Sequence, residues 1–425
     1  MFKENLLDKI LGFIRSRLIP KSVFSFFQPL YHTLLAYIGA LMYGFPSRSM
    51  KVIGVTGTKG KSTVVFVTAK ILEELGYSVA SVGSLGFKIK NKEWANNLKM
   101  TMPGRFKLQS FLRQAKNAGC EFVVMEVTSE GIAQKRHLGI KFDSAVFLNI
   151  HPEHIENHGS FENYLSAKQE LFKVTKNTHI INADDSHLQD FSKFKSYKKI
   201  FFGKNEADVR FKISKSDASG SEFEIYGTNF KTSLAGEFNV YNCVASIATA
   251  IGYGAELPAM ESTISKIDSI PGRMNFIQRD PFMVVVDYAH TPDSLKGVYK
   301  AMRSYSSGKL ICVLGAAGGG RDKWKRPEFG RIADGFCDKI FLTDEDPYEE
   351  SPDRILDEIE AGISETQKIT RILSREEAIK SAIQSAEPGD GVIITGKGSE
   401  NSMAVKGGKK ISWSDMEVVK KYLIK

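Results

Sequence analysis

The segment Thr56-Gly-Thr-Lys-Gly-Lys-Ser-Thr63 constrains the fold of this chain more than any other. It follows the apolar run 51–55, which reads as a buried strand, and it precedes residues 61–76, which read as a helix ended by glycine. Glycines let backbone amides turn inward around phosphate oxygens, and the start of a helix adds its positive dipole end. A strand, such a loop and a helix in this order predict a nucleotide-binding α/β domain.

Within this loop, Lys61 supplies a point charge for the β- and γ-phosphates, and Ser62 can reach Mg²⁺. The strict pattern G-x-x-x-x-G-K-[ST] has glycine where Val55 stands, so the loop is a variant of it. The bland alternative is a chance glycine turn. The residues expected to bind ATP here are Gly57, Thr58, Lys59, Gly60, Lys61, Ser62 and Thr63. A phosphate loop alone does not identify the reaction, because kinases, GTPases and motors share it.

Apolar runs that alternate with helical stretches continue along the chain. They predict strands at 77–82, 122–127, 144–150, 283–287, 309–314, 339–342 and 391–395. Such alternation is typical of a mostly parallel sheet covered by helices. Short alternating stretches over 197–235 predict a small antiparallel insertion. We expect an α/β chain with a short helical segment (1–47), a central P-loop ATPase-like domain (48–270) and a C-terminal Rossmann-like domain (271–425).

Composition narrows the class of protein. The 425 residues have ordinary globular usage, and the 58 basic against 49 acidic residues give a net charge of +9. This charge fits an anionic partner or simply a solvated basic surface. The four cysteines are scattered without a C-x-x-C pair, which disfavours a thiolate zinc site and a disulfide framework and indicates a reducing, cytoplasmic compartment.

The first 47 residues differ from the rest. Basic residues precede an uncharged run, 23–45, that is about as long as a membrane span. Pro29 lies inside it and should break a helix. Three interpretations stay open: helices packed on the following domain, a basic and aromatic anchor at a membrane surface, or a true span. No cleavage site typical of a secretory signal follows.

Three later segments carry groups suited to ATP chemistry. Glu126 ends an apolar strand, where a Mg²⁺ ligand beside a phosphate loop is expected. The stretch 153–159 holds two carboxylates and two imidazoles, among them His154, although a polar loop has the same composition. Lys168 lies in an amphipathic helical stretch, where a solvated lysine is the plain alternative.

Taken together, these motifs resemble the Mur ligase family, over about residues 50–402 and in the family's order. The resemblance implies an ATP-dependent ligase of peptidoglycan precursor synthesis. Such an enzyme adds diaminopimelate or lysine to UDP-MurNAc-L-Ala-D-Glu through an acyl phosphate. It also implies two Mg²⁺ ions held by Ser62, Glu126, His154 and a carbamylated Lys168. Lys61, Lys168, His154 and Glu126 are then the catalytic residues.

The resemblance also assigns the two substrates' sites. Asn239 and Asn242 correspond to residues that read adenine, Arg273 to one on the phosphates, and Asp287 and His290 to residues near the nucleotide. The residues implied to bind the peptide substrate are Thr101, Met102, Ser129, Gln134 and Arg136. Those implied to bind the acceptor amino acid are Arg321, Asp346, Tyr348, Gly396 and Glu400.

Tyr348 stands where the family has an arginine that pairs with the distal carboxylate of diaminopimelate. The acidic residues around it favour a cationic side-chain end, as in lysine, unless they form only a solvated turn. The N-terminal segment is also shorter than the family's uridine-binding domain.

The same residues leave two other ligases open: a folylpolyglutamate-synthetase-like ligase and a Mur-like ligase with a non-UDP acyl substrate. Two other classes of protein are a nucleic-acid-dependent ATPase and a scaffold with a residual nucleotide site. We expect a monomer that binds a nucleotide-linked peptide and a free amino acid but no nucleic acid, with membrane contact through 1–47 left open.

Overall fold

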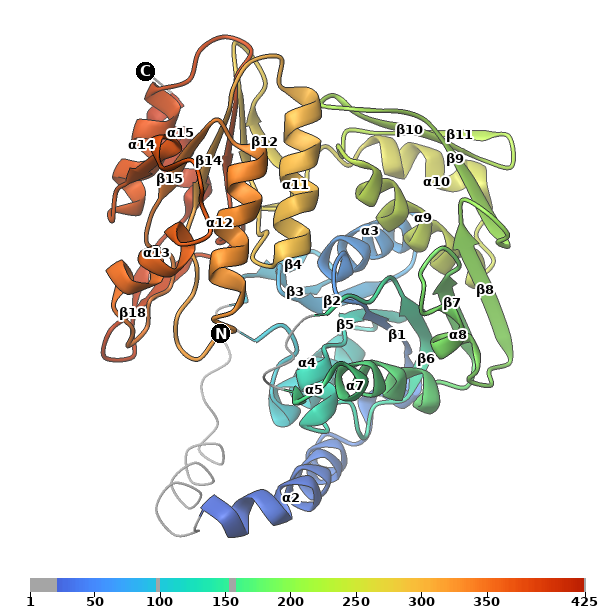
Figure 1. The fold of residues 1–425 in the computed structure, drawn as a ribbon. Coiled ribbons are helices and arrows are strands. Elements are labelled where there is room, and N and C mark those ends of the chain that lie inside the picture. The colour runs from blue at the N-terminus through green and yellow to red at the C-terminus, as the bar shows by residue number, and fades with distance from the viewer. Residues whose placement is uncertain (1–20, 97–99, 153–157, 424–425) are drawn as a thin grey trace. The chain divides into compact units, whose positions relative to one another are not determined.

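The structure is a computed structural model that describes residues 21–96, 100–152 and 158–423 (Figure 1). The chain divides into two compact units. The first comprises residues up to 151 together with 162–210 and 244–256, and the second comprises 152–161, 211–243 and 257–425. The chain changes unit within strand β9 (Val209–Asp217) and within helix α9 (Glu237–Gly252).

The first unit is built on a parallel sheet whose strand order is β8-β7-β6-β1-β5-β2. Two antiparallel strands, β3 and β4, extend it beyond β2. The bounds are β1 (Lys51–Thr56), β2 (Val79–Gly83), β3 (Gly86–Ile89), β4 (Lys92–Trp94), β5 (Phe122–Glu126), β6 (Phe142–Phe147), β7 (Thr178–Asn182) and β8 (Lys198–Gly203). Strands β5 and β7 are buried along their whole length, because helices cover both faces of a parallel sheet.

Helices and short turns connect these strands. They are α2 (Lys21–Met42), η1 (Pro46–Ser49), α3 (Lys61–Glu74), α4 (Arg105–Asn117), α5 (Ser129–Ala133), α7 (Phe161–Val174) and α8 (Leu188–Ser192). The predicted strand, loop and helix at 51–76 are confirmed. The antiparallel insertion is confirmed over β9, β10 (Gly220–Ile225) and β11 (Thr228–Thr232). It begins later than expected, since β8 pairs parallel with β7.

The second unit contains a sheet of strand order β12-β13-β17-β14-β15-β16, parallel except for β12. One face packs on helices α11 to α13, and the other on α14 and α15 (Figure 1). The strands are β12 (Asn275–Gln278), β13 (Met283–Val286), β14 (Leu310–Leu314), β15 (Lys339–Leu342), β16 (Ile369–Arg371) and β17 (Gly391–Ile394). All four strands predicted after residue 280 are therefore present.

The other elements of this unit are helical apart from one hairpin. The helices are α10 (Leu257–Ser265), α11 (Pro292–Tyr305), α12 (Lys325–Phe336), α13 (Pro352–Glu360), η2 (Thr366–Lys368), α14 (Arg375–Gln384) and α15 (Asp415–Leu423). The hairpin pairs β18 (Ser402–Val405) with β19 (Lys409–Ser412).

Two expectations are wrong. Helix α2 runs through Pro29, because an interior proline removes one backbone hydrogen bond and the rest of the helix can persist. A disulfide joins Cys312 of β14 to Cys337 at the end of α12, although the sequence spacing gave no sign of it. These residues come together because α12 leads directly into β15, the neighbour of β14. Among the described helices, none combines the length and hydropathy that a bilayer crossing requires.

Candidate active site

In the first unit, the phosphate loop lies where four adjacent parallel strands end. The loop follows β1, Glu126 is the last residue of β5, Ser84 follows β2 and Asn149 follows β6. The strand order β6-β1-β5-β2 makes these carboxyl ends neighbours. Open parallel sheets bind ligands at the carboxyl ends of their strands, so the position agrees with a nucleotide site.

Asn149 fixes the conformation of the loop. Its side-chain oxygen accepts a hydrogen bond from the Lys59 amide at 2.9 Å, and its carbonyl accepts one from the Thr58 amide at 3.0 Å. The Thr58 hydroxyl is 2.9 Å from the Tyr164 hydroxyl. The amides at the start of α3 have no earlier helical turn to bond to, which leaves them available to an anion.

Two lysines converge on one carbonyl of the loop. Lys61 Nζ donates to the carbonyls of Gly57 and Thr58, both at 2.8 Å. Lys168 Nζ also donates to the Gly57 carbonyl at 2.8 Å and lies 4.6 Å from the centre of the Tyr164 ring. Lys168 is only 2% exposed. The alternative of a solvated Lys168 is therefore wrong, and the structure brings this lysine to the phosphate loop as expected.

The side chains of Ser62 and Glu126 are connected through the Ser84 hydroxyl. The Ser62 hydroxyl lies 2.6 Å from the Ser84 hydroxyl. Glu126 Oε1 accepts hydrogen bonds from the amide and the hydroxyl of Ser84, at 2.7 and 2.9 Å. Gly83 makes room for the carboxylate, because a Cβ there would overlap Glu126 Oε1. Glu126 is 3% exposed, so its orientation is fixed by packing as well as by Ser84.

This chemistry fits a magnesium ion. Mg²⁺ prefers oxygen ligands and uses few protein groups besides phosphates and water. Glu126 and Ser62 supply a carboxylate and a hydroxyl beside the loop. Within the described residues, no three His, Cys, Asp or Glu side chains form a ready-made metal cage. His154, the other expected ligand, lies outside the described residues.

A second group in the first unit gathers around Arg136. Its guanidinium donates to the Met102 carbonyl and, at 2.7 Å, to the Gln134 side chain. Arg105 donates to the Gln134 carbonyl at 2.5 Å. Burial lowers the pKa of Arg136, and the charge of Glu130 partly offsets this. Met102, Gln134 and Arg136 are thus together, as the peptide-site expectation requires.

Thr101 precedes Met102, and Ser129 is the first residue of α5. No contact of either side chain with the Arg136 group is found in the described residues, so their contact with a peptide substrate stays a prediction.

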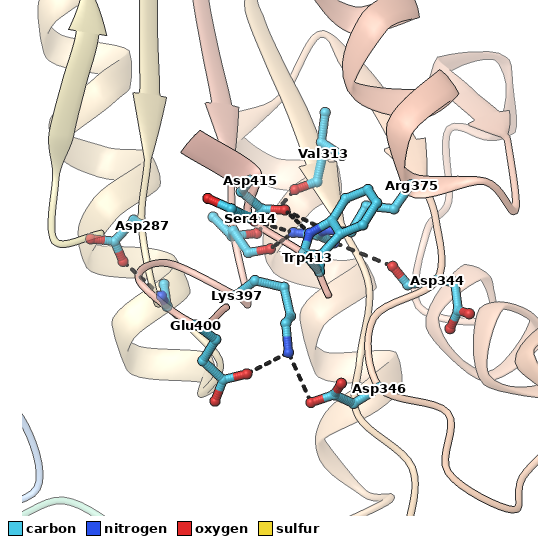
Figure 2. A network of polar contacts seen from close by, with 12 residues as sticks. Asp287, Val313, Asp344, Asp346, Arg375, Lys397, Glu400, Trp413, Ser414 and Asp415 are labelled. Atoms are coloured by element: carbon cyan, nitrogen blue, oxygen red, sulfur yellow. Dashed lines mark hydrogen bonds and ion pairs between the residues drawn. The ribbon is translucent and has the colours of Figure 1, made fainter. Parts of the chain in front are cut away.

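In the second unit, Lys397 is the centre of a polar network (Figure 2). Its ammonium pairs with Asp346 at 3.0 Å and with Glu400. Asp346 also accepts a hydrogen bond from the Ala404 amide at 2.6 Å. Burial would lower the pKa of Lys397, but the two carboxylates outweigh it and raise that pKa. Asp346 and Glu400, two expected acceptor residues, are therefore held together by a lysine that the motifs did not single out.

The same network reaches the expected nucleotide residues of this unit. Tyr288 donates to Glu400 at 3.2 Å, and the Arg273 guanidinium lies 4.2 Å from the Tyr288 ring centre. Asp287 accepts hydrogen bonds from the amides of Met274 and Ala289, at 2.6 and 2.7 Å. Asp287 therefore holds the backbone at Met274 and at Ala289 in place. His290 Nδ1 is bonded to the Tyr288 carbonyl at 2.8 Å.

Tyr348 lies against the glycine-rich loop that carries Arg321. A Cβ on Gly319 would come within 2.7 Å of the Tyr348 ring, so only glycine lets the loop approach so closely. The Gly318 amide donates to the Asp346 carbonyl at 2.8 Å, which holds the two loops together. Arg321 itself is exposed.

Glu345 is a buried carboxyl beside Gly396. A Cβ on Gly396 would overlap Glu345 Oε2, so this glycine makes room for the carboxyl. Burial raises the pKa of Glu345 to about 7, although Arg375 and Lys397 act in the opposite direction. Nearby, Arg375 and Asp415 form a buried ion pair with contacts of 2.8 and 2.7 Å (Figure 2).

The two asparagines that are expected to bind adenine lie one turn apart in α9. Asn242 donates to the Asn239 side-chain oxygen at 3.2 Å, and both residues are buried. Their recognition of adenine stays a prediction.

Sequence reasoning missed the residues that hold the site in place, chiefly Ser84, Asn149, Tyr164, Arg105 and Lys397. Two of them had a usable signal. Asn149 lies near the end of the predicted strand 144–150, and Lys397 lies inside the glycine-rich stretch 395–400. Tyr164 begins the helical stretch that holds Lys168, but nothing in the sequence assigned it a role. Ser84 and Arg105 stand in stretches without a motif, where only the fold shows their role.

Comparison with known proteins agrees with this geometry. Residues 55–250 match the Mur ligase middle domain, and residues 272–398 match the Mur ligase, glutamate ligase domain. The chain is 39% identical over 396 residues to UDP-N-acetylmuramoyl-L-alanyl-D-glutamate--2,6-diaminopimelate ligase of Trichormus variabilis, covering 90% of this chain and 79% of the relative.

One solved structure supports the same assignment, and a second shows the fold. A structure of an enzyme with that same ligase name is 30% identical, with a TM-score of 0.62 over 88% of this chain and 78% of its own. MurF ligase from Thermotoga maritima in complex with ADP is 22% identical, with a TM-score of 0.68 over 91% and 83%, and shows the shared fold. The chain therefore belongs to the Mur ligase family, the ATP-dependent ligases that form amide bonds.

Proposed function

We propose that this chain joins an amino acid, diaminopimelate or lysine, to UDP-MurNAc-L-Ala-D-Glu in peptidoglycan precursor synthesis. The observation that carries the proposal is the 39% identity, over 90% of this chain, to a relative named as the ligase that joins diaminopimelate to this peptide substrate. The phosphate loop, Lys61 and Glu126 at neighbouring strand ends support it.

The reaction must first activate a carboxylate, which is a poor electrophile. A carboxylate oxygen of the peptide attacks the γ-phosphorus of ATP, the bond to the bridging oxygen breaks, and ADP leaves. The acceptor's amine then attacks the carbonyl carbon of the acyl phosphate, and phosphate leaves as the amine loses a proton. Lys61 and the amides at the start of α3 offset the charge on the phosphates.

We further propose that Glu126, Ser62 and His154 hold Mg²⁺ and that Lys168 carries a carbamate. Bound Mg²⁺ supplies charge neutralisation at the phosphates. A carbamate forms when the Lys168 amine adds to carbon dioxide and loses a proton, which converts a buried cation into an oxygen ligand. The position of Nζ at the Gly57 carbonyl supports this assignment.

The acceptor site is proposed to lie in the second unit, around Arg321, Asp346, Tyr348, Gly396 and Glu400. The pairing of Lys397 with both Asp346 and Glu400 supports this grouping. Asn239, Asn242, Arg273, Asp287 and His290 are proposed to bind ATP. We propose domain bounds of 1–47, 48–270 and 271–425, a monomer, and a cytoplasmic location.

Phosphate release tests the proposal. Purified chain with Mg²⁺, ATP and UDP-MurNAc-L-Ala-D-Glu is screened with lysine, diaminopimelate, ornithine and other amino acids. We expect turnover only with both the peptide and one amino acid, and Lys61→Ala abolishes it. The matched control is Lys70→Ala on the exposed side of the same helix, which keeps turnover. If none of the amino acids in the set supports turnover, the proposed substrate is contradicted.

A further inference from the structure

Helix α2 presents its large apolar side chains to solvent. Leu30, Leu34, Tyr37 and Leu41 are 66, 58, 49 and 69% exposed. Their spacing of four, three and four residues places them on one side of a helix. An exposed apolar stripe of this kind on a folded unit marks an interaction surface.

The opposite side of α2 is the one packed on the protein, and apart from His32 its buried residues are small. Ala36 and Ala40 are fully buried, and Gly39 faces the Phe106 ring of α4. Gly139 meets the Ala40 methyl so closely that a Cβ there would lie 2.5 Å from it. The helix is thus anchored by its small face, and its larger apolar face stays outward. A helix that served only the core would have the reverse arrangement.

The sequence around helix α2 has a net positive charge. Residues 1–51 contain seven lysines and arginines and two acidic residues. No Asp or Glu occurs between Asp8 and Glu73. Arg48 is exposed in η1, directly after the helix. Basic residues that flank an apolar stripe are complementary to anionic headgroups above an acyl layer.

From this arrangement we propose that α2 docks on the surface of an anionic phospholipid bilayer, with Leu30, Leu34, Tyr37 and Leu41 inserted at the headgroup boundary. The helix lies in the plane of that surface, because its small face stays packed on α4. Tyr37 has the amphipathic ring that is enriched at this depth. A second copy of the chain fits less well, because pairing two such faces brings two basic segments together.

The inference is independent of the proposed acceptor and donor, because α2 holds no residue of the site. It implies that the ligase works beside a membrane surface.

Vesicle flotation of the full chain tests the proposal. Vesicles of phosphatidylcholine and phosphatidylglycerol in a ratio of about 7:3 are compared with phosphatidylcholine alone. We expect binding to the mixed vesicles, little binding to the neutral ones, and a severalfold loss when NaCl is raised from about 0.05 to about 0.5 M. Failure of the wild-type chain to float, or equal binding to both vesicles, contradicts the proposal.

The apolar part is tested by Leu34→Glu with Leu41→Glu. Each change places a charge where an apolar side chain enters the bilayer, so we expect the partition coefficient to fall at least about tenfold. The matched control is Leu373→Glu with Ile411→Glu, at two exposed apolar residues of the second unit, and it keeps wild-type flotation. Equal flotation of the α2 variant and the wild type overturns the proposal.

Two further measurements distinguish lipid binding from misfolding of the variant and from self-association. ATP-dependent phosphate release by the α2 variant stays at the wild-type level if the variant folds, since Leu34 and Leu41 are exposed. If lipid covers the exposed face of α2, sedimentation velocity without vesicles shows one species for the wild type and one for the α2 variant. A concentration-dependent dimer that the α2 variant loses assigns the face to a second copy and overturns the lipid proposal.

Discussion

Ser84 holds the carboxylate of Glu126 through two hydrogen bonds, from its amide at 2.7 Å and from its hydroxyl at 2.9 Å. Because Ser84 also touches Ser62, a residue outside every motif connects the phosphate loop to the expected metal ligand. Groups that orient a metal ligand tune its affinity for the ion.

Ser84→Ala removes the hydroxyl but keeps the amide. We expect the Mg²⁺ concentration for half-maximal phosphate release to rise about tenfold, with a smaller effect on the rate at saturating Mg²⁺. Glu126→Gln is expected to abolish turnover at any Mg²⁺ concentration. A Mg²⁺ titration of both variants measures this, and an unchanged curve for Ser84→Ala shows that the hydroxyl does not orient the ligand.

Tyr348 controls the acceptor if the acceptor site lies around Asp346 and Glu400. An arginine can bind a carboxylate through two parallel hydrogen bonds, whereas a tyrosine offers one hydroxyl. Tyr348→Arg is therefore expected to shift kcat/KM towards diaminopimelate over lysine by about tenfold or more. Tyr348→Phe serves as the control that removes only the hydroxyl. An identical ratio in all three chains places Tyr348 outside the acceptor site.

Glu345 makes stability depend on pH. Burial raises its pKa to about 7 in the folded chain, whereas a carboxyl in the unfolded chain titrates near its ordinary value of 4.5. Between these values the folded state holds one more proton than the unfolded state. The free energy of unfolding therefore falls as pH rises from about 4.5 to about 7, and it levels off above.

Urea unfolding at about pH 5 and about pH 8 checks this dependence. We expect Glu345→Gln to lose a smaller part of its stability than the wild type over this interval. Glu387→Gln, at an exposed carboxylate, keeps the wild-type difference. If Glu345→Gln shows the same fall as the wild type, another group titrates.

Asp415 stabilises the second unit through a buried ion pair near the expected acceptor residues. It receives two hydrogen bonds from Arg375 and one from the Trp413 ring at 2.8 Å. Asp415→Ala leaves a buried guanidinium without its charge partner, which costs about 3–5 kcal/mol of unfolding free energy. Glu417→Ala breaks only an exposed pair and is expected to change stability by less than about 0.5 kcal/mol. Similar values for the two variants contradict a structural role for the ion pair.

The fold was largely predictable from sequence, because parallel strands buried on both faces read as continuous apolar runs. The runs that became β1, β5 and β17 show this clearly. Short edge strands such as β4 and β12 gave no such signal. Helix α2 was misread at Pro29, since its packing through Ala36 and Ala40 depends on a surface that appears only after folding.

The site was predictable where the chemistry needs a local motif. The glycines and Lys61 stand in one segment, so their grouping can be read directly from the chain. Contacts between distant segments could not be read in this way. Lys397 pairs with Asp346 across 51 positions, and only the order of strands β14, β15 and β17 brings these two residues together.

The mass of the reaction product tests the central claim most directly. The chain is incubated with ATP, Mg²⁺, UDP-MurNAc-L-Ala-D-Glu and the amino acid that supports phosphate release. We predict a product whose mass equals the peptide substrate plus the amino acid minus one water, formed with one ADP per molecule and absent with Lys61→Ala. ADP formed without any ligated product contradicts the assignment of this chain as the ligase for that substrate.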